Sequence, residues 1–253
     1  MPAPGKGEVQ LRQTAIGFNF IDVYQRSGVY PLELPTGLGH EAVGVVEALG
    51  EGVTRFKVGD RVMYMNAGIG AYASARNVAV DKLVSVPDGV SDEVAAAVFF
   101  KAMTAQYLVQ KTYKVKSGDV VLVHAAAGGV GQILAGWAKS LGAFVVGTVG
   151  SEAKFAAAKE AGCDAVVDYS KPNWVEEVIK ATGGRKANVV YDSVAKTTFL
   201  GSLDCAAPFG TVALFGAASG PAPEIHPEIL NKKGCLFLTR PSVFPHNATP
   251  ELL

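Results

Sequence analysis

The sequence predicts an α/β protein in which a β-rich, barrel-like part is followed by a doubly wound parallel sheet. Between residues 40 and 80, short apolar runs alternate with glycine-containing turns, which is typical of an antiparallel sheet. After Gly118, strand-like runs alternate with helical patterns as far as Thr239, which is typical of a parallel sheet covered by helices. A glycine-rich loop at residues 126–131 joins the first of these strands to its helix.

Composition narrows the class of protein. Charged residues make up 18% of the 253 residues and hydrophobic residues 49%, so the chain can bury a large core. Because 23 basic residues balance 23 acidic ones, a dedicated nucleic-acid or anionic-membrane binder is not expected. No apolar run approaches the roughly 18 residues that span a bilayer, and the N-terminus lacks a signal-peptide pattern, so we expect a cytoplasmic protein. The scattered Cys163, Cys205 and Cys235 exclude a disulfide framework and a cysteine-rich metal site.

The first domain is expected to cover residues 1–100. Strands are predicted at residues 42–49, 58–65 and 72–80, and a Pro-Asp-Gly turn at residues 87–89 closes the region. Ser91 is a good N-cap for the helix that follows. That helix is expected to bury one face, formed by Ala95, Val98, Phe99, Ala102 and Ala105.

The second domain is expected to cover residues 101–240. Its first strand, at residues 120–124, is apolar throughout and so is predicted to be buried on both faces. A helix with apolar residues at helical spacing follows and ends at Gly142. Further strands are predicted at 144–149, 165–169, 189–193, 211–215 and 235–239, with helices at 152–161, 174–181, 199–206 and 228–232. Six strands in this alternation form a doubly wound parallel sheet.

The glycine loop indicates a dinucleotide site. At the start of a helix, unpaired N–H groups and the helix dipole favour a pyrophosphate. Gly128 and Gly129 would let the backbone approach the phosphates, and Gly131 would let the helix pack on the strand. Ala126 stands where the usual pattern has its first glycine, so the loop is a variant. The alternative is a tight turn with no ligand.

The second strand indicates which dinucleotide would bind. An NAD site usually has an acidic residue at the end of this strand to hold the ribose diol. Residues 147–151 contain no acid, whereas Lys154 and Tyr169 follow nearby. This pattern favours the 2′-phosphate of NADPH. The alternative is that Lys154 is an ordinary solvated lysine in the first turn of a helix.

Six stretches of the chain form a further pattern: IGFNFIDVY at 16–24, GHEA at 39–42, VGDRV at 58–62, HAAAGGVG at 124–131, VYDSV at 190–194 and TRPS at 239–242. Together they resemble zinc-independent medium-chain dehydrogenases/reductases of the quinone oxidoreductase, or zeta-crystallin-like, type. The resemblance runs from about residue 5 to residue 242. It implies a Rossmann domain that binds NADPH, a GroES-like barrel catalytic domain, and an active site in the cleft between them. It also implies hydride transfer to a quinone or to another electron-poor conjugated carbonyl.

The resemblance also implies the residues of the site. Asn19, Tyr24 and Tyr30 match positions that line the nicotinamide pocket, although both tyrosines could instead be packing residues at a domain edge. A proton could come from water or from either tyrosine hydroxyl. Lys154 and Tyr169 match positions that flank the 2′-phosphate. The complete set expected to bind the cofactor is Ala127, Gly128, Gly129, Val130, Gly131, Gly150, Ser151, Lys154, Tyr169, Ser193, Phe215 and Asn231.

No metal is expected at this site. Related zinc alcohol dehydrogenases bind the catalytic metal through two cysteines and a histidine. His40 stands at the histidine position, but Asn19 and Phe100 stand at the two cysteine positions. A tetrahedral catalytic site needs three good protein ligands. We therefore expect His40 to be a hydrogen-bonded pocket or core residue.

Both ends depart from the family pattern. The chain starts within what resembles a hairpin, and the Thr-Pro-Glu of residues 249–251 resembles a helix start close to residue 253. Residues 241–253 are therefore expected to begin a C-terminal segment that returns to the catalytic domain in the family. The sequence is expected to be a piece of a longer protein.

Three functions stay open. The first is NADPH-dependent quinone reduction. The second is reduction of α,β-unsaturated ketones or aldehydes. The third is a silent NADPH-binding protein, since some zeta-crystallin-like proteins are lens proteins or bind RNA, although neutral charge without a basic-aromatic run argues against RNA.

A homodimer is expected through strand 235–239. This strand would be the last of the parallel sheet, and it carries Leu236, Phe237 and Leu238 in succession. An exposed apolar edge invites pairing with another chain, and a two-fold partner closes the contact. The alternative is that a C-terminal segment covers the edge.

Overall fold

The computed structural model describes residues 1–249, which form two compact units. The first unit comprises Met1–Met103 together with the residues that follow Val243, and the second comprises Thr104–Val243. The expected domain boundaries lie after residues 100 and 240. The expected helix start at residues 249–251 lies largely outside the described residues.

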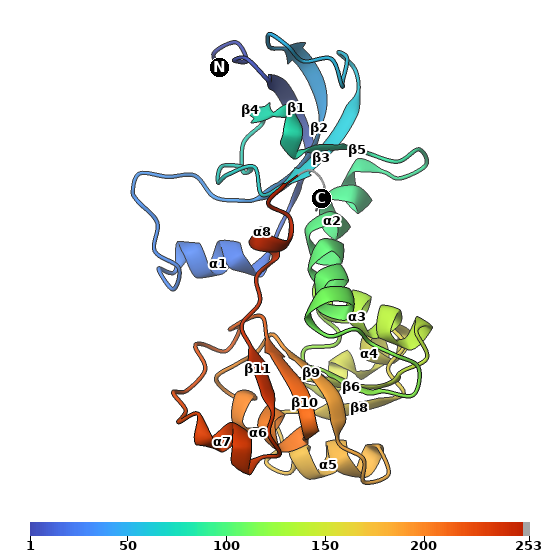
Figure 1. The fold of residues 1–253 in the computed structure, drawn as a ribbon. Helices are drawn as coiled ribbons and strands as arrows, with labels where there is room; N and C mark the ends of the chain where they lie inside the picture. Colours follow the sequence, from blue (N-terminus) through green and yellow to red (C-terminus); the bar gives the residue numbers. More distant parts are fainter. Residues whose placement is uncertain (250–253) are drawn as a thin grey trace. The chain divides into compact units, whose positions relative to one another are not determined.

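The first unit contains a five-stranded antiparallel sheet, shown at the top of Figure 1. Its strand order is β4-β1-β2-β3-β5. Alternating residues of the long first strand point inward, so that Val9 and Leu11 join Val46, Val62 and Tyr64 in one core. The strands are β1 (Glu8–Gly17), β2 (Glu41–Leu49), β3 (Arg61–Met65), β4 (Ala75–Ala79) and β5 (Leu83–Ser85).

Two predicted strands are shorter in the structure. The strand expected at 58–65 begins at Arg61, because Gly59 has a φ of +95° and forms a turn, and Val58 is 61% exposed. The strand expected at 72–80 covers only Ala75–Ala79 and leads into a 3-10 turn, η1 (Val80–Lys82). Helix α1 (Phe20–Arg26), which was not predicted from the sequence, connects β1 to the segment before β2.

The predicted helix after Ser91 is α2 (Asp92–Tyr107), which continues into the π-helical turn η2 (Leu108–Thr112). Ser91 caps it as expected, since its Oγ accepts a hydrogen bond from Val94 N at 3.3 Å. The predicted apolar face is partly wrong. Ala95, Ala96 and Phe100 are buried, whereas Val98 is exposed, because the buried stripe is rotated from the predicted one.

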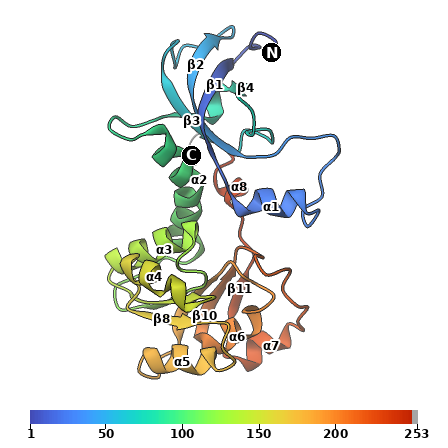
Figure 2. The same ribbon diagram turned by 180° about the vertical axis from the view of Figure 1, so that it is seen from behind.

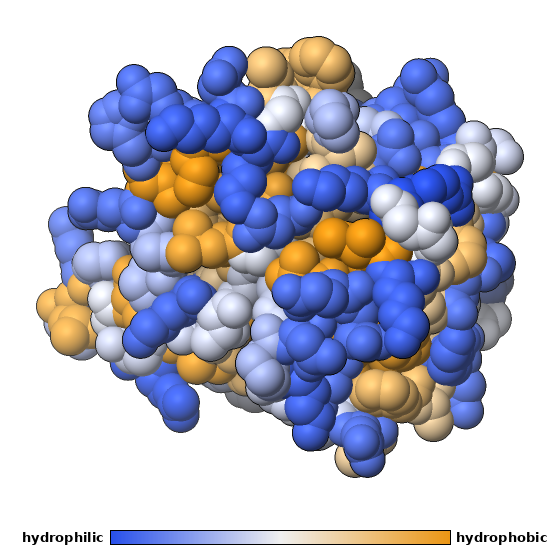
Figure 3. All heavy atoms as spheres, turned by 90° about the horizontal axis from the view of Figure 1, so that it is seen from below, coloured by the Kyte–Doolittle hydropathy of each residue, from blue (hydrophilic) through white to orange (hydrophobic). Residues whose placement is uncertain are grey.

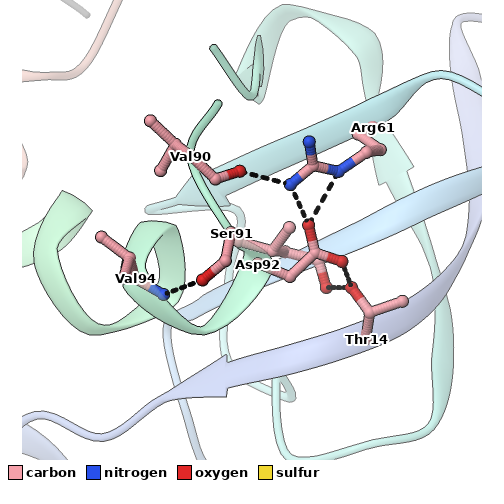
Figure 4. A network of polar contacts seen from close by, with 7 residues as sticks. Thr14, Arg61, Val90, Ser91, Asp92 and Val94 are labelled. Atoms are coloured by element: carbon pink, nitrogen blue, oxygen red, sulfur yellow. Dashed lines mark hydrogen bonds and ion pairs between the residues drawn. The ribbon is translucent and has the colours of Figure 1, made fainter. Parts of the chain in front are cut away.

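A polar network ties the start of α2 to the sheet (Figure 4). Asp92 accepts hydrogen bonds from Arg61 Nε at 2.9 Å and from Thr14 Oγ1 at 2.6 Å. Arg61 Nη2 also donates to Val90 O at 2.7 Å. The Thr14 hydrogen bond and the Arg61 guanidinium lower the pKa of Asp92, whereas partial burial acts against this lowering. One carboxylate therefore links β1, β3 and α2.

The second unit is a doubly wound parallel sheet, as predicted. Its six strands lie in the order β11-β10-β9-β6-β7-β8, and helices lie on both sides of the sheet (Figures 1 and 2). The strands are β6 (Val120–Val123), β7 (Phe144–Val149), β8 (Ala165–Asp168), β9 (Ala187–Asp192), β10 (Ala206–Leu214) and β11 (Phe237–Thr239). The helices are α3 (Gly129–Ser140), α4 (Phe155–Glu160), α5 (Trp174–Ala181), α6 (Phe199–Cys205) and α7 (Glu228–Lys232), followed at the unit boundary by α8 (Val243–His246).

The core of this unit explains the unbroken apolar runs of its strands. Val120 and Leu122 of β6 are buried against Trp174 of α5 and Phe199 and Leu203 of α6. Both faces of a central parallel strand are covered, so polar alternation is absent.

On the face seen from below in Figure 3, hydrophilic residues surround separate hydrophobic patches. No helix within residues 1–249 is both long and apolar enough to cross a membrane.

Two predicted elements of this unit need correction. The helix expected at 152–161 is divided into a 3-10 turn, η3 (Glu152–Lys154), and α4. The strand expected at 235–239 begins only at Phe237. Cys235 has a φ of +56°, which an extended strand does not allow, and Leu236 is buried in the core.

Candidate cofactor-binding and active site

Most predicted cofactor-binding residues lie at one edge of the parallel sheet. The glycine loop follows β6, Gly150 and Ser151 follow β7, and Tyr169 follows β8 directly. Ser193 follows β9 and Phe215 follows β10. Since parallel strands end at the same edge, these residues gather beyond the carboxyl ends of the strands. β6 lies between β7 and β9, where the strand order reverses, which is the usual ligand position in such sheets.

The glycine loop has the geometry that a pyrophosphate requires. Ala125 adopts a φ of +51° and turns the chain sharply after the strand. Gly128 is the N-cap of α3, and Gly128 and Gly129 are both exposed. A Cβ on Gly131 would lie 2.3 Å from Ala125 O, so only glycine lets the helix pack this closely on the loop. The first turn of a helix lacks acceptors for its N–H groups, so this turn can hold an anion.

Tyr169 and Gly150 are in direct contact. A Cβ on Gly150 would lie 2.9 Å from Tyr169 Oη, and Tyr169 N donates to Val149 O at 2.9 Å. Ser151 is the N-cap of η3, and Lys154 is exposed at the end of the same turn. Glu152, an acid that directly follows residues 147–151, is exposed here too. The structure thus groups the residues expected around the 2′-phosphate.

Ser193 and Phe215 are held by backbone contacts between two strand ends. Phe215 N donates to Asp192 O at 2.8 Å, and Ala218 N donates to Ser193 O at 3.0 Å. A Cβ on Gly216 would lie 2.5 Å from Ser193 O, so the two loops approach closely.

Asn231 does not belong to this group. It lies in α7, near the end of that helix, and its Nδ2 donates to Cys235 Sγ at 3.6 Å. The neighbouring Lys233 pairs with Asp204, near the end of α6. The end of α6 leads into the amino end of β10, so Asn231 lies toward the opposite edge of the sheet from the glycine loop.

Under the carboxyl edge lies a buried polar cluster that was not predicted from the sequence. His124 Nδ1 and Thr148 Oγ1 are 2.7 Å apart, and His124 Nε2 and Ser202 Oγ are 2.9 Å apart. Ser202 Oγ donates to Asp192 Oδ2 at 2.8 Å, and Asp192 also accepts Val194 N at 2.8 Å. Burial lowers the pKa of His124, while Asp192 acts against this.

This cluster cannot act as a hydrolytic triad. His124, Asp192 and Ser202 are all 0% exposed, so no substrate can reach the serine. The carboxylate also contacts the serine rather than the histidine. The cluster instead fixes the ends of β6, β7 and β9 beneath the loops. His124 and Ser202 are 78 positions apart in sequence, so no local spacing could have shown that they meet.

The predicted nicotinamide-pocket residues come together in the first unit. Asn19 is the N-cap of α1, and Tyr24 lies in the same helix. The rings of Tyr24 and Tyr30 are 5.1 Å apart, and Tyr30 N donates to Tyr24 O at 3.1 Å. Asn19 N donates to Asp22 Oδ2 at 2.9 Å, and Tyr72 Oη donates to the same oxygen at 2.9 Å. Burial and this bond to Asp22 raise the pKa of Tyr72 to about 12.

The residues at the zinc-ligand positions have other partners. His40 Nε2 lies 3.1 Å from Gln25 Oε1, and the His40 ring packs 5.3 Å from that of Phe244. Burial lowers the pKa of His40, and nearby Asp22 acts in the other direction. Asn19 Nδ2 donates to Glu41 Oε2 at 2.8 Å. Among residues 1–249, no group of three or more His, Cys, Asp or Glu side chains is arranged to hold a metal ion.

The chain combines an antiparallel sheet of this kind with a parallel sheet that has a glycine loop at its switch point. This combination defines a medium-chain dehydrogenase/reductase. The family model described as "Alcohol dehydrogenase GroES-like domain" matches residues 5–88. The model described as "Zinc-binding dehydrogenase" matches residues 129–246. The chain belongs to the quinone oxidoreductase family within this class. The resemblance in the sequence is thereby confirmed, as is the fold that it implies.

Individual relatives show how close the similarity is. The chain is 50% identical to the quinone oxidoreductase of Pseudomonas aeruginosa over 99% of its own length and 77% of that protein. It is 47% identical to a 2-haloacrylate reductase from a Burkholderia species, of which it covers 75%. Among solved structures, Escherichia coli quinone oxidoreductase complexed with NADPH has a TM-score of 0.96 and 46% identity. The match covers 100% of this chain and 78% of that one.

Proposed function

We propose that this protein is an NADPH-dependent quinone reductase. The glycine loop at the switch point of the sheet, with Tyr169 and Lys154 beyond the next two strands, is the observation that carries the proposal. The similar quinone oxidoreductase of Escherichia coli, solved with NADPH, supports the same cofactor here. Its hydride donor would be NADPH and its acceptor a quinone.

Each group of residues has a role in this proposal. The backbone N–H groups of residues 128–131 would bind the pyrophosphate, and Lys154 would pair with the 2′-phosphate. Asn19, Tyr24 and Tyr30 would line the pocket for the nicotinamide and the acceptor. NADPH, when bound, supplies the hydride. A quinone is already an electron-poor acceptor, so the protein has mainly to orient the two reactants and exclude water.

A second candidate function is reduction of an alkene conjugated to a carbonyl group. The 47% identity to a 2-haloacrylate reductase favours this possibility, because a haloacrylate is an electron-poor conjugated alkene. Both acceptors carry an electron-poor conjugated system that can accept a hydride. The same pocket chemistry could therefore serve either one.

The proposal includes zinc independence, a homodimer and a cytoplasmic location. Asn19 and Phe100 at two zinc-ligand positions support the first of these. The exposed apolar residues of β11 at a sheet edge support the second. The three free thiols among residues 1–249 support a reducing compartment.

Stopped-flow oxidation of NADPH with a panel of quinones and conjugated enones or acrylates tests the proposed function. Oxidation with quinones at a higher kcat/KM than with the alkenes is the expected result. Faster reaction with the alkenes would favour the second candidate. Binding of NADPH without turnover on any acceptor would overturn both reductase functions and leave a silent binding protein.

A further inference from the structure

The buried carboxylate of Glu41 lies at the centre of the Asn19 environment. Glu41 is 1% exposed and is the first residue of β2, paired in register with Gly17 of β1. A Cβ on Gly17 would lie 2.1 Å from Glu41 Oε2, so glycine at position 17 makes room for this carboxylate. A buried charge is costly unless it is hydrogen-bonded or paired. The fold therefore accommodates Glu41 specifically.

The two carboxylate oxygens of Glu41 have different partners. Oε1 accepts the backbone N–H of Phe100 in α2 at 2.5 Å. Oε2 accepts Asn19 Nδ2 at 2.8 Å and lies 3.9 Å from Lys101 Nζ. Lys101 Nζ in turn donates to Phe18 O at 3.0 Å. Glu41 and Lys101 thus fasten Phe18 and Asn19, the two residues that precede α1, to α2.

The bond to Asn19 determines how the amide of that side chain is oriented. A primary amide has one donor side and one acceptor side, whereas an ionised carboxylate can only accept hydrogen bonds. Nδ2 of Asn19 must therefore face Glu41, and a flipped amide would set two acceptors against each other in a buried place. A neutral glutamine at position 41 could donate or accept, so it would allow both orientations of Asn19.

We propose that Glu41 is a positioning residue that fixes which side of the Asn19 amide faces the nicotinamide pocket, with Lys101 as the cation that pairs with it. This inference rests on the proposed function, since Asn19 is assigned to the pocket there. Glu41 itself does not touch the cofactor or the acceptor. It acts only through Asn19.

A double-mutant cycle tests the proposal in the full chain. Glu41→Gln is expected to lower kcat with a quinone by about tenfold, which corresponds to about 1.4 kcal/mol, because Glu41 and Asn19 are in direct contact and so should be coupled. In the Asn19→Ala background the same substitution should change kcat less than about twofold. The matched control is Glu47→Gln, an exposed residue of the same strand, which should leave kcat unchanged. Equal losses in both backgrounds, or an Asn19→Ala variant as active as the wild type, would overturn the proposal.

The dependence of kcat on pH in Lys101→Met gives a second test. This test remains valid even if Glu41→Gln fails to fold. Burial raises the pKa of Glu41, the bonds from Phe100 N and Asn19 and the charge of Lys101 lower it, and Asp22 raises it. Activity that needs the ionised carboxylate falls as the pH drops through this pKa. Lys101→Met should move that fall to higher pH, and Lys101→Arg should restore the wild-type pH profile. If Lys101→Met has the same pH profile as the wild type, the proposed role of the ion pair is overturned.

The activity of the wild type distinguishes a failure of this proposal from a failure of the proposed function. If the wild type oxidises no NADPH with any acceptor, the function fails, and the cycle is then run on NADPH affinity by nicotinamide fluorescence. Loss of affinity in Glu41→Gln that disappears in the Asn19→Ala background would still support the positioning role. Additive effects would refute it.

Discussion

The phenol of Tyr169 lies directly against the backbone of Gly150, since a Cβ built on Gly150 would be 2.9 Å from Tyr169 Oη. These residues follow two neighbouring strands, β7 and β8, and both belong to the set expected to bind the cofactor. Burial raises the pKa of Tyr169, so its hydroxyl stays protonated and can donate a hydrogen bond at neutral pH. The carboxyl edge thus combines a phenol donor, a glycine and a nearby cation.

Lys154→Ala should weaken NADPH binding by roughly tenfold, because a charge-assisted bond to the 2′-phosphate is lost. NADH, which lacks that phosphate, should bind the variant and the wild type alike. Titration of nicotinamide fluorescence measures both affinities. Lys180→Ala, on the solvent-exposed side of α5, is the control and should change neither. Equal affinity of the wild type for the two cofactors would contradict the NADPH assignment.

Gly129→Val should abolish NADPH binding with little loss of stability, because the new side chain would stand at the exposed start of α3 where the phosphates approach. Gly131→Val is the contrasting variant. Its Cβ would clash with Ala125 O, so it should lower the unfolding temperature as well. Calorimetry and cofactor titration together distinguish the two. A folded Gly129→Val protein with normal affinity would refute the phosphate-loop assignment.

Purified protein should contain no stoichiometric zinc, and a chelator should leave quinone reduction unchanged. The reason is that Asn19 is bonded to Glu41, and a phenylalanine at position 100 offers no ligand atom. Elemental analysis measures the metal content directly. One tightly bound zinc per chain would show that this assignment is wrong.

Phe237→Glu should shift a homodimer toward monomer or aggregate. Phe237 is 62% exposed on β11, the edge strand of the parallel sheet, and a buried charge at a paired edge is costly. Light scattering at micromolar concentration should give twice the chain mass of 26.3 kDa for the wild type. Leu200→Glu, at an exposed position of α6, is the control. A monodisperse wild type at the single-chain mass would rule the dimer out.

Asp92→Asn should lower the free energy of unfolding at pH 7 by about 1–2 kcal/mol, because charge-assisted bonds to Arg61 and Thr14 are weakened. The folded pKa of Asp92 is lowered from its ordinary 3.8, so the ionised form stabilises the fold. The difference between wild type and variant should persist above the ordinary pKa and shrink as the pH falls through the lowered one.

Denaturant titrations from neutral pH to below the ordinary pKa of Asp92 measure this difference in the free energy of unfolding between wild type and Asp92→Asn. Glu47→Gln is the matched control, since its ion pair with Arg12 is exposed and should be worth little. A difference between wild type and Asp92→Asn that grows toward low pH would contradict the prediction.

The parallel sheet could be predicted from sequence because its strands are buried on both faces. The resulting apolar runs, separated by helical patterns, are compatible with few other folds. The strand predicted at 144–149 and the helix predicted at 174–181 coincide with β7 and α5. The short strands of the first unit were harder to place. There the turn at Gly59 decides where β3 begins, and β4 pairs with β1 only from Ala75 onward. Such turns carry weak sequence signals.

The sequence by itself determined the fold class, the glycine loop and its place after the first parallel strand, because these depend on local spacing and on hydrophobic periodicity. Tertiary structure decided which distant side chains meet. The contact of Asn19 with Glu41 joins positions 22 apart, and the cluster around Asp192 joins several strand ends. It also placed Asn231 away from the loop edge. Such contacts are absent from local patterns because the packing of whole elements, not the sequence spacing, brings these groups within hydrogen-bonding distance.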